Sequence, residues 1–591
     1  MIFRKMKVNS LIRTIHGFKR NYTVIRYFSG AVPQKENRSY YFKNGAIPLT
    51  PITLGNLLDT AADTYGDSIA FASNHQGISK TYLEFKKEVE TLASGFIACG
   101  LKRGDRIAIY SPNCYEWSLT QFAAGKAGLI LVNLNFLSQL QEVEHSLQSV
   151  SCKAVISCDK HRKQDYYEIF NRIIPDLSTQ NPKNLRSEKL PDLNSIIIIS
   201  DDHKKGTLRF KDVSDSRNKE SDTLLTQTEK LIQCDDPVNI QFTSGTTSLP
   251  KGAVLTHHNI INNAIYSARR AQFDLMRPIL CCQVPLFHTF GCVIGTLSPI
   301  LHGGTIVFPS AGFDSIESLK TIEKYRCNVL FGTPTMIIDI VKNYKLLHHD
   351  ISSLKQVTIG GSPAPGGLLK ELQNDLKIQK VQIAYGLTET SPVISLTNLN
   401  EGKEAMISDF LEPIEELELK IIDEEGRIVP INTKGEVLAR GYSIFSGYWN
   451  DKVKTEEAID KSKWFHTGDI GVLNEKGHLK IDGRIKDMVI RGGENIYTSE
   501  VESFLSTHPA ILEVQICGVP DERLGEELCC WIHVKSGMNL TEEEVRNFCK
   551  EKISNYKIPR YIMFIEQFPR TASGKIKKNE MTRISKEQLN L

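Results

Sequence analysis

The feature of this sequence that most constrains its fold is a repeated alternation of short apolar runs with helix-length segments. The runs RIAIYS, LILVNLN, VNIQFTS, NVLFGTP, QVTIGGSP and VQIAYGLTE are typical of buried strands, and helix-length segments separate most of them. Parallel strands need long crossover connections of this kind. The alternation therefore predicts an α/β fold with doubly wound parallel sheets.

Polar, glycine-rich turns follow four of the predicted strands. The turns FTSGTT, FGTPT, IGGSPA and AYGLTE each begin where a strand pattern ends. In open α/β sheets, ligands bind beyond the carboxyl ends of the strands. One such turn is an ordinary strand end, but four together predict a large shared binding site.

The chain has 591 residues, which is too many for one hydrophobic core. We predict a large N-terminal domain over residues 29–485, with a small β subdomain at about 405–482. Residues 486–591 mix strands and helices and predict a small α+β domain. Two capping-box patterns, Ser499 with Glu502 and Thr541 with Glu544, mark the predicted starts of its helices.

The N-terminus has a composition of its own. Basic residues are frequent before Lys35, Ser and Thr are interspersed, and no acidic residue precedes Glu36. This composition predicts a mitochondrial transit peptide over residues 1–28, cut after Phe28, and hence a location in the mitochondrial matrix. A merely basic tail is the alternative. The chain ends in QLNL, which is not the peroxisomal address.

The remaining composition is ordinary. The net charge is +3 and part of it belongs to the N-terminal segment, so nothing calls for nucleic acid as a partner. No apolar stretch is long enough to span a membrane. The 13 cysteines include no C-x-x-C pair and are interpreted as reduced thiols. The polar stretch 201–230 is interpreted as a surface excursion, and the oligomeric state is not indicated.

The segment QFTSGTTSLPKGAV, residues 241–254, predicts a phosphate-binding loop. Hydroxyl groups and backbone N–H groups of such a loop can surround phosphate oxygens, and a lysine adds a point charge. It is not a Walker A loop, because Lys251 lies between Pro250 and Gly252 and the loop joins two strands.

Four further motifs follow in order. They are YGLTET at 385–390, HTGDIG at 466–471, GRIKDMVIRGGENIYTSEVE at 483–502 and PRTASGKIKK at 569–578. With the loop, this set resembles the acyl-adenylate-forming enzymes, which include acyl-CoA synthetases, luciferases and the adenylation domains of peptide synthetases. The resemblance implies that a carboxylate attacks ATP to form an acyl-adenylate, and that a thiol then releases AMP. The implied cofactors are ATP and Mg²⁺, with coenzyme A as co-substrate.

The resemblance also implies roles for the matched residues. Lys575 would bridge the substrate carboxylate and the α-phosphate, Thr388 would hydrogen-bond the α-phosphate, and Glu389 would coordinate Mg²⁺. The β- and γ-phosphates would be held by the loop residues Thr243, Ser244, Gly245, Thr246, Thr247, Ser248, Leu249, Pro250 and Lys251.

The nucleoside end of ATP has its own implied contacts. Tyr385 and the turn that contains Gly361 and Ser362 would flank adenine. Asp469 would accept hydrogen bonds from the ribose hydroxyls, and Arg484 would add a ribose or phosphate contact. Taken singly, these residues are also ordinary: an aspartate in a turn is usually solvated.

Two more regions are implied by the resemblance. Lys486 would be the hinge of a mobile C-terminal domain, whose Gly492 and Gly493 would let the backbone approach the pantetheine arm of coenzyme A. His288, in PLFHTFG, would line the acyl pocket, and a hydrogen-bonded core histidine is the alternative.

The sequence departs from the family pattern at two places. Ser248 stands where the family loop usually has Gly, and a serine with positive φ costs roughly 1 kcal/mol. The segment LEPIEE, Leu411 to Glu416, replaces a family segment richer in Pro and Gly.

The predicted function is an AMP-forming fatty acyl-CoA synthetase that uses a medium-chain acid. Alternatives are another acyl-adenylate-forming ligase, such as a carrier-loading adenylation domain or a luciferase-like oxygenase, and a non-catalytic binding protein. A non-catalytic protein would be expected to lack Lys575, Glu389 or Asp469, and all three are present.

Overall fold

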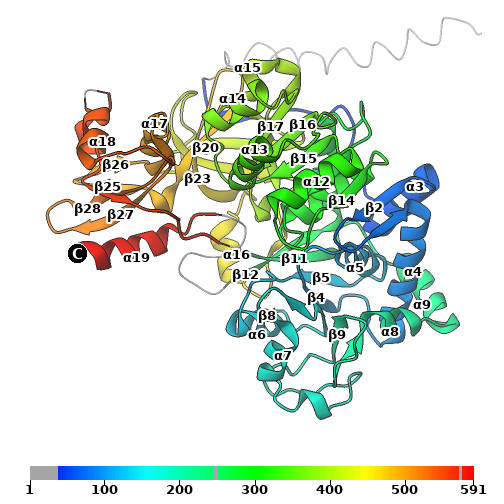
Figure 1. Cartoon of the computed structure of the whole chain (residues 1–591). Helices are drawn as coiled ribbons and strands as arrows, with labels where there is room; N and C mark the ends of the chain where they lie inside the picture. The colour runs from blue at the N-terminus through cyan, green and yellow to red at the C-terminus, as the bar shows by residue number, and fades with distance from the viewer. Residues whose placement is uncertain (1–36, 244–249, 551, 572–574) are drawn as a thin grey trace, which may run out of the picture.

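The computed structural model describes residues 37–243, 250–550, 552–571 and 575–591. The predicted transit peptide and the loop residues Ser244 to Leu249 lie outside the described residues. In Figure 1 the chain forms a large body with a smaller C-terminal domain beside it.

The first sheet of the large body has eight strands. β10, β9, β6, β4, β5 and β11 run parallel to their neighbours, and β12 and β22 continue the sheet antiparallel. In spatial order the strands are β10 (Leu208–Arg209), β9 (Ser195–Ile199), β6 (Ala154–Cys158), β4 (Arg106–Tyr110), β5 (Ile130–Asn133), β11 (Pro237–Thr243), β12 (Lys251–Thr256) and β22 (Gly447–Tyr448).

The second sheet has nine strands, with a parallel centre and antiparallel edges. In spatial order the strands are β19 (Glu412–Pro413), β18 (Val393–Leu396), β17 (Lys380–Gly386), β16 (Gln356–Gly360), β15 (Val329–Gly332), β13 (Ile279–Cys282), β14 (Thr305–Phe308), β2 (Ile69–Ser73) and β3 (Ile78–Thr81). Both sheets confirm the predicted doubly wound α/β fold.

Helices cover both faces of each sheet. On β4, Ile107 and Ile109 join the central core shared by the two sheets, while Ala108 and Tyr110 join the core on the outer face. The helices of the large body are α3 (Leu54–Tyr65), α4 (Tyr82–Ala98), α5 (Tyr115–Lys126), α6 (Leu140–Ser149), α7 (Tyr166–Ile173), α8 (Phe210–Asp215), α9 (Lys219–Glu229), α10 (His257–Arg270), α11 (Leu297–Ile300), α12 (Ser315–Tyr325), α13 (Pro334–Leu347), α14 (Gly366–Asn374), α15 (Lys403–Met406) and α16 (Lys452–Ala458).

Helix α5 shows why the two sheets form one body. It is buried along its whole length, and it contacts β2 of the second sheet as well as β4 and β5 of the first. An all-round buried helix is expected between two sheets, because neither face meets water.

The stretch 201–230 lies mostly at the surface, as interpreted from the sequence, and two helices form within it. Its helices α8 and α9 pack on α4, where Ser94 Oγ donates to Asp222 Oδ1 over 2.7 Å. The approach is close, because a Cβ at Gly95 would lie 2.1 Å from the carbonyl oxygen of Val213. The polar residues of this stretch belong to the outer faces of these helices.

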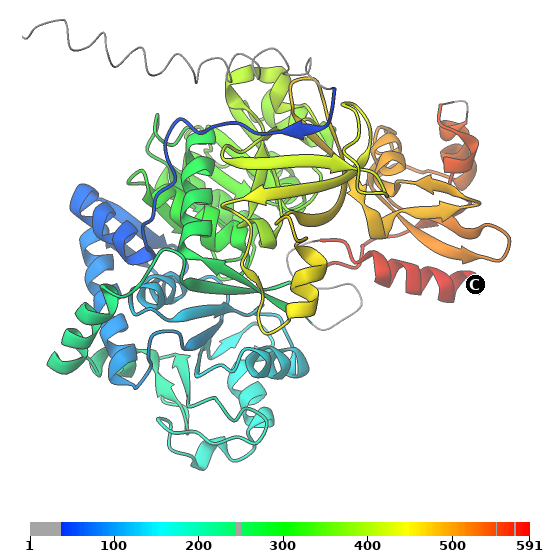
Figure 2. The same ribbon diagram turned by 180° about the vertical axis from the view of Figure 1, so that it is seen from behind.

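A third sheet has five antiparallel strands and forms the β-rich part of the large body. They are β1 (Tyr40–Tyr41), β20 (Leu417–Ile422), β21 (Gly435–Gly441), β23 (Phe465–Leu473) and β24 (Leu479–Arg484). Figure 2 shows β1, in blue, lying against this sheet, in yellow, although the two are far apart in sequence.

The C-terminal domain is an α+β unit. Its strands are β26 (Glu494–Ile496), β25 (Val489–Arg491), β28 (Gly525–Val534), β27 (Ile511–Asp521) and β29 (Tyr561–Phe564), and its helices are α17 (Thr498–Leu505), α18 (Glu542–Cys549) and α19 (Lys578–Leu589). The Thr541 capping box is confirmed. The Ser499 capping box was wrong: α17 begins at Thr498, and Glu502 accepts the N–H of Ile516 and pairs with Lys578 instead.

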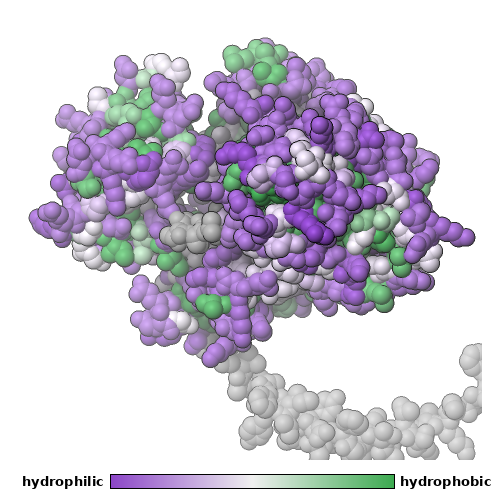
Figure 3. Space-filling model, turned by 90° about the horizontal axis from the view of Figure 1, so that it is seen from below, coloured by the Kyte–Doolittle hydropathy of each residue, from purple (hydrophilic) through white to green (hydrophobic). Residues whose placement is uncertain are grey.

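Over the described residues, no helix is long and apolar enough to cross a membrane. The face in Figure 3 is mostly hydrophilic, with separate small hydrophobic patches. Scattered apolar residues of this kind are usual on a protein surface.

Candidate functional site

The four polar turns come from both central sheets. The loop after Thr243 joins β11 to β12 of the first sheet, strand to strand as predicted. The other three turns follow β15, β16 and β17, which are adjacent parallel strands of the second sheet. Parallel neighbours present their carboxyl ends at one edge, so these three turns lie side by side.

Asp469 is a buried residue of the candidate nucleotide site with two side-chain partners. It lies on β23 with an exposed fraction of 2%, opposite Arg484 in the register of β23 and β24. Tyr385 donates its hydroxyl to Oδ2 over 2.7 Å, and Arg484 forms an ion pair with Oδ1, with an N–O distance of 2.9 Å. The structure thus brings three of the predicted ATP-binding residues together.

Burial governs the protonation of this group. Burial raises the pKa of Asp469 above its ordinary value, against the opposing effect of Arg484 and the hydrogen bond from Tyr385. Burial and the neighbouring Asp469 also raise the pKa of Tyr385, so its hydroxyl stays a donor. Each oxygen of Asp469 has one partner, and a carboxylate offers about four acceptor positions, so ribose hydroxyls could still be accepted.

Glu389 lies on the short 3₁₀ helix Thr388–Thr390, directly after β17. Its exposed fraction is 9%. Tyr448 donates its hydroxyl to Oε1 over 2.9 Å, and Phe445 donates its backbone N–H to the Glu389 carbonyl over 2.9 Å. No described residue hydrogen-bonds the other carboxylate oxygen, Oε2, and a hard oxygen of this kind fits Mg²⁺.

Lys251 lies close to the same group. It is the last residue of the predicted phosphate loop and the first residue of β12, and its Nζ is 5.2 Å from the ring centroid of Tyr448. Burial is the main cause that raises the pKa of Tyr448, followed by the charge of Glu389, so this hydroxyl also stays protonated.

Lys575 comes to this site from the C-terminal domain. Its pKa is lowered, first because the surrounding protein displaces water from the ammonium and then because Arg484 repels it, while Asp469 and Glu389 act in the opposite direction. The residue as a whole still reaches solvent. These electrostatic neighbours place Lys575 with the residues predicted to bind ATP.

Other contacts hold the C-terminal domain against the large body in this arrangement. Arg570 donates from Nη1 to Thr335 Oγ1 over 3.1 Å, beside the turn that follows β15. Lys434 of the large body pairs with Glu500 of α17, with an N–O distance of 3.5 Å. The C-terminal domain therefore contacts the large body at two separate places.

His288 is half-buried next to Lys575. Burial lowers its pKa to about 3, and the charge of Lys575 adds to the effect, so the imidazole is neutral at pH 7. The turn that carries it is tight, because a Cβ at Gly291 would lie 2.3 Å from the carbonyl oxygen of Pro285. A π-helix, Phe290–Gly295, follows directly, a form that is often found at functional sites.

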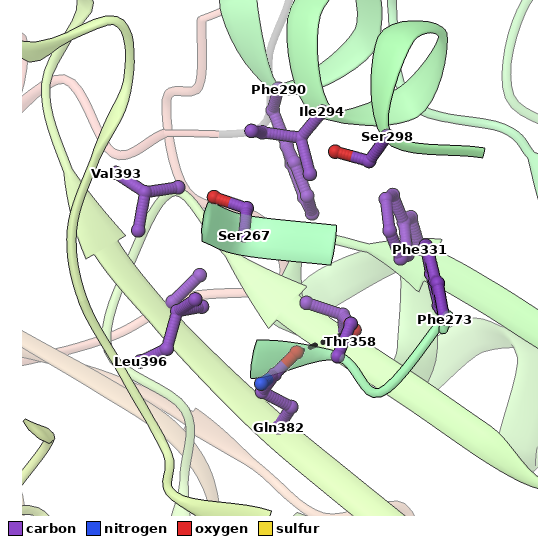
Figure 4. Close-up of a pocket in the computed structure, with 12 residues that line it drawn as sticks. Ser267, Phe273, Phe290, Ile294, Ser298, Phe331, Thr358, Gln382, Val393 and Leu396 are labelled. Carbon is purple, nitrogen blue, oxygen red and sulfur yellow. Dashed lines mark hydrogen bonds between the residues drawn. The ribbon is translucent and has the colours of Figure 1, made fainter. Parts of the chain in front are cut away.

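A small cavity lies beside this π-helix, whose Phe290 and Ile294 line it (Figure 4). Phe290 and Phe331 stack at the wall of the cavity with ring centroids 5.4 Å apart. Ser267 also lines the cavity, and its buried hydroxyl has no hydrogen-bond partner among the described residues. The other residues that line it are Ala271, Phe273, Ile294, Ser298, Thr358, Gln382, Ala384, Val393 and Leu396.

The remaining predicted residues are placed as follows. Gly361 and Ser362 are exposed directly after β16, and Gly361 has a φ of +94°. Lys486 lies on the 3₁₀ helix Ile485–Asp487, where burial and then Arg484 lower its pKa. Gly492 and Gly493 form the exposed turn between β25 and β26, with φ values of +60° and +88° that favour glycine. A Cβ at Gly493 would meet no heavy atom within 4 Å, so this arrangement does not bring that glycine into a close contact.

Sequence reasoning missed Tyr448, Phe331, Ser267 and Gln382. They come from different elements, and only Phe331 lies in one of the four predicted turns, FGTPT. Phe290 lies inside the motif PLFHTFG, and its place next to His288 was a second available signal.

A second group of possible metal ligands lies elsewhere, where Glu401, Glu412 and His478 come together. Glu412 forms ion pairs with Lys43 and Arg270. Because these cations already neutralise the carboxylate, the group is a structural ion-pair network. It also shows that the unusual segment LEPIEE is held in place by charge pairs.

Comparison with protein families gives two matches in chain order. The model described as "AMP-binding enzyme" matches residues 58–449, and "AMP-binding enzyme C-terminal domain" matches residues 500–575. The chain belongs to the AMP-binding enzyme family. The predicted resemblance to the acyl-adenylate-forming superfamily is confirmed.

Curated relatives match this AMP-binding enzyme over nearly its whole length. A protein of Danio rerio named "Medium-chain acyl-CoA ligase ACSF2, mitochondrial" is 42% identical over 94% of this chain and 91% of its own. The protein of the same name from Homo sapiens is 39% identical over 91% and 88%. "Putative acyl-CoA synthetase YngI" of Bacillus subtilis is 38% identical over 91% and 98%. These matches confirm the predicted resemblance to mitochondrial acyl-CoA synthetase family member 2.

Solved structures share the fold of this AMP-binding enzyme. The anthranilate CoA ligase AuaEII in complex with anthranoyl-AMP has a TM-score of 0.79 at 23% identity, and covers 92% of this chain and 99% of its own. ATP-bound MatB from Rhodopseudomonas palustris has a TM-score of 0.78 at 23% identity, and covers 91% and 100%.

Proposed function

We propose that this AMP-binding enzyme is an acyl-CoA synthetase that activates a medium-chain fatty acid with ATP and Mg²⁺ and transfers it to coenzyme A in the mitochondrial matrix. The relatives named as mitochondrial medium-chain acyl-CoA ligases support the substrate class and the location. The observation that carries the proposal is the buried Asp469, which contacts Tyr385 and Arg484 and on which the charge of Lys575 also acts.

The first half-reaction joins the fatty acid to AMP. Asp469, with Tyr385 and Arg484, would orient the ribose, and Lys575 would lie between the acid carboxylate and the α-phosphate. Thr388 and the loop that ends at Lys251 would hold the phosphates, as the matched motifs imply. The chain acts by positioning and by stabilising negative charge as the carboxylate oxygen bonds to phosphorus and pyrophosphate leaves.

Glu389 is the proposed Mg²⁺ ligand, because its buried carboxylate keeps one oxygen free of described hydrogen bonds. Mg²⁺ bound there would offset part of the negative charge of the ATP phosphates. The hydroxyls of Thr388 and of the phosphate loop would complete the surroundings of the nucleotide.

The acyl chain would extend from His288 toward the cavity behind Phe290. A neutral imidazole suits this place, because it adds no charge beside an apolar chain. The aromatic and aliphatic lining of the cavity provides an apolar environment for the end of the chain.

The second half-reaction needs another arrangement of the C-terminal domain. We propose that the domain turns about Lys486 and that the turn with Gly492 and Gly493 then approaches coenzyme A. The charges of Asp469 and Glu389 act on Lys575 in the arrangement described here, which supports its assignment to the first half-reaction. The large domain would end and the small domain begin at this hinge.

The test is the release of pyrophosphate and AMP with a series of acids from acetate to stearate, with and without coenzyme A. We expect turnover that depends on the acid, has its maximum at medium chain length and needs coenzyme A to form acyl-CoA. A lack of turnover with every acid would contradict the proposal and favour a non-catalytic binding protein. A maximum at long chain length would contradict only the substrate class.

A further inference from the structure

Tyr448 contacts two charged residues of the candidate site. Its hydroxyl donates to Oε1 of Glu389 over 2.9 Å, and the Nζ of Lys251 lies 5.2 Å from the centroid of its ring. One side chain therefore touches the proposed metal ligand with its polar end and the lysine of the phosphate loop with its aromatic face.

The backbone of Tyr448 is firmly held. β22 pairs antiparallel with β12, so that Tyr448 lies opposite Ala253. On either side, Ser446 donates its N–H to Val254 and Trp449 donates its N–H to Gly252, over 2.9 and 2.8 Å. Tyr448 is thus attached to the strand that begins at the end of the phosphate loop.

The same segment also holds Glu389. The N–H of Phe445 donates to the backbone carbonyl of Glu389, and the Phe445 ring packs edge-on against Tyr448 with centroids 4.9 Å apart. The main chain and the carboxylate of Glu389 are therefore both held by residues 445–448. A hydrogen bond to one oxygen fixes the carboxylate orientation and leaves the other oxygen for a ligand.

We propose that Tyr448 is a positioning residue for the MgATP complex: its hydroxyl aims Oε2 of Glu389 at Mg²⁺, and its ring holds Lys251 at the end of the phosphate loop. This inference rests on the proposed role of Glu389 as the Mg²⁺ ligand. Tyr448 would thus connect the two central sheets, because Glu389 follows β17 of one sheet and Lys251 begins β12 of the other.

The two contacts of Tyr448 are chemically separable. The variant Tyr448→Phe keeps a ring for the Lys251 ammonium and loses the donor to Glu389, while Tyr448→Leu loses both. Hydrogen-bonding partners of metal ligands change metal affinity by about 10–100-fold when they are removed. The matched control is Tyr442→Phe, in the same segment, whose hydroxyl has no hydrogen-bond partner among the described residues.

The experiment measures equilibrium binding of a fluorescent ATP analogue over a series of Mg²⁺ concentrations, without acid or coenzyme A. We expect Tyr448→Phe to raise the Mg²⁺ concentration for half-maximal binding about tenfold and to leave binding in EDTA unchanged. We expect Tyr448→Leu to weaken binding in EDTA as well. Tyr442→Phe should match the wild type, and thermal unfolding confirms that each variant is folded.

A double-mutant cycle with Glu389→Gln decides whether Tyr448 acts through Glu389. We expect Tyr448→Phe to have no further effect on the Mg²⁺ midpoint once Glu389 is changed. Additive effects of the two substitutions on the Mg²⁺ midpoint would overturn the role of the Tyr448 hydroxyl, and so would a wild-type midpoint in Tyr448→Phe. Wild-type ATP-analogue binding by Tyr448→Leu in EDTA would overturn the role of the ring. ATP binding by the wild-type protein that does not depend on the Mg²⁺ concentration would instead contradict the proposed role of Glu389.

Discussion

Asp469 and Lys575 are two parts of one candidate site that the fold positions in opposite ways. Asp469 is buried on a sheet strand, and both of its oxygens are held by side chains of the same body. Lys575 reaches solvent and is brought to the nucleotide site by the placement of a separate domain. The comparison supports the proposal that the large body supplies the nucleotide contacts and that a hinged C-terminal domain carries Lys575 to them.

The variant Lys575→Ala provides the strongest test of this comparison. Loss of one group that stabilises transition-state charge costs about 10²–10³-fold, and we expect adenylate formation to fall by about 10³-fold. Thioester formation from supplied acyl-adenylate and the Tm should both stay near wild type. Equal loss of both half-reactions would contradict the role assigned to Lys575.

The variant Lys486→Pro tests whether movement of the C-terminal domain depends on the proposed hinge. Proline fixes φ near −65°, so the backbone of Lys486 could no longer rotate freely. We expect thioester formation to fall by about 10²-fold, the loss that a misplaced group typically causes, while adenylate formation falls much less. Single-turnover measurement of each half-reaction checks this. An equal loss of rate in both half-reactions would mean that the hinge lies elsewhere.

The variant Tyr385→Phe tests the part of the candidate site that lies in the large body, around Asp469. It removes the hydrogen bond to Asp469 and leaves the ion pair with Arg484, and a hydrogen bond to a charged group contributes about 1.5–3 kcal/mol. We expect the KM for ATP to rise tenfold or more, because a tenfold change corresponds to about 1.4 kcal/mol. The KM for the acid should change less. Steady-state kinetics with each substrate varied in turn is the measurement. An increase confined to the acid would mean that Tyr385 faces the acyl site.

The variant Ser248→Gly extends the comparison to the phosphate loop. Ser248 lies outside the described residues, so this prediction comes from the family pattern alone. Relief of about 1 kcal/mol of backbone strain would raise kcat/KM for ATP by up to about fivefold. A large loss in kcat/KM would show that the serine hydroxyl itself binds ATP.

The smallest expected effect is a shift in pH dependence. The role proposed for Lys575 in adenylate formation needs its ammonium form, whose pKa is lowered, so the rate should fall as the pH rises through that lowered value. Lys486 contributes to the lowering, and Lys486→Gln removes its charge. The alkaline limb of the adenylation rate should therefore move to higher pH by less than one unit, which a pH series checks. A shift to lower pH would contradict the repulsion between the two lysines.

The sequence predicted the parts of the fold that depend on local pattern. Apolar alternation identified β4, β11, β16 and β17 because buried parallel strands read as short apolar runs. The capping box at Thr541 was confirmed because it is solvent-exposed and local. The one at Ser499 failed because Ile516 and Lys578, distant in sequence, compete for Glu502.

What the sequence by itself determined here is the α/β fold, the family and the identity of Asp469, Glu389 and Lys575 as candidates, because their motifs are contiguous. Only the tertiary structure decided that Tyr448 touches both Glu389 and Lys251, and that Phe290, Phe331 and Ser267 share a cavity. The physical reason is that such contacts arise where sheets and domains meet, and packing between elements leaves no periodic signal along the chain.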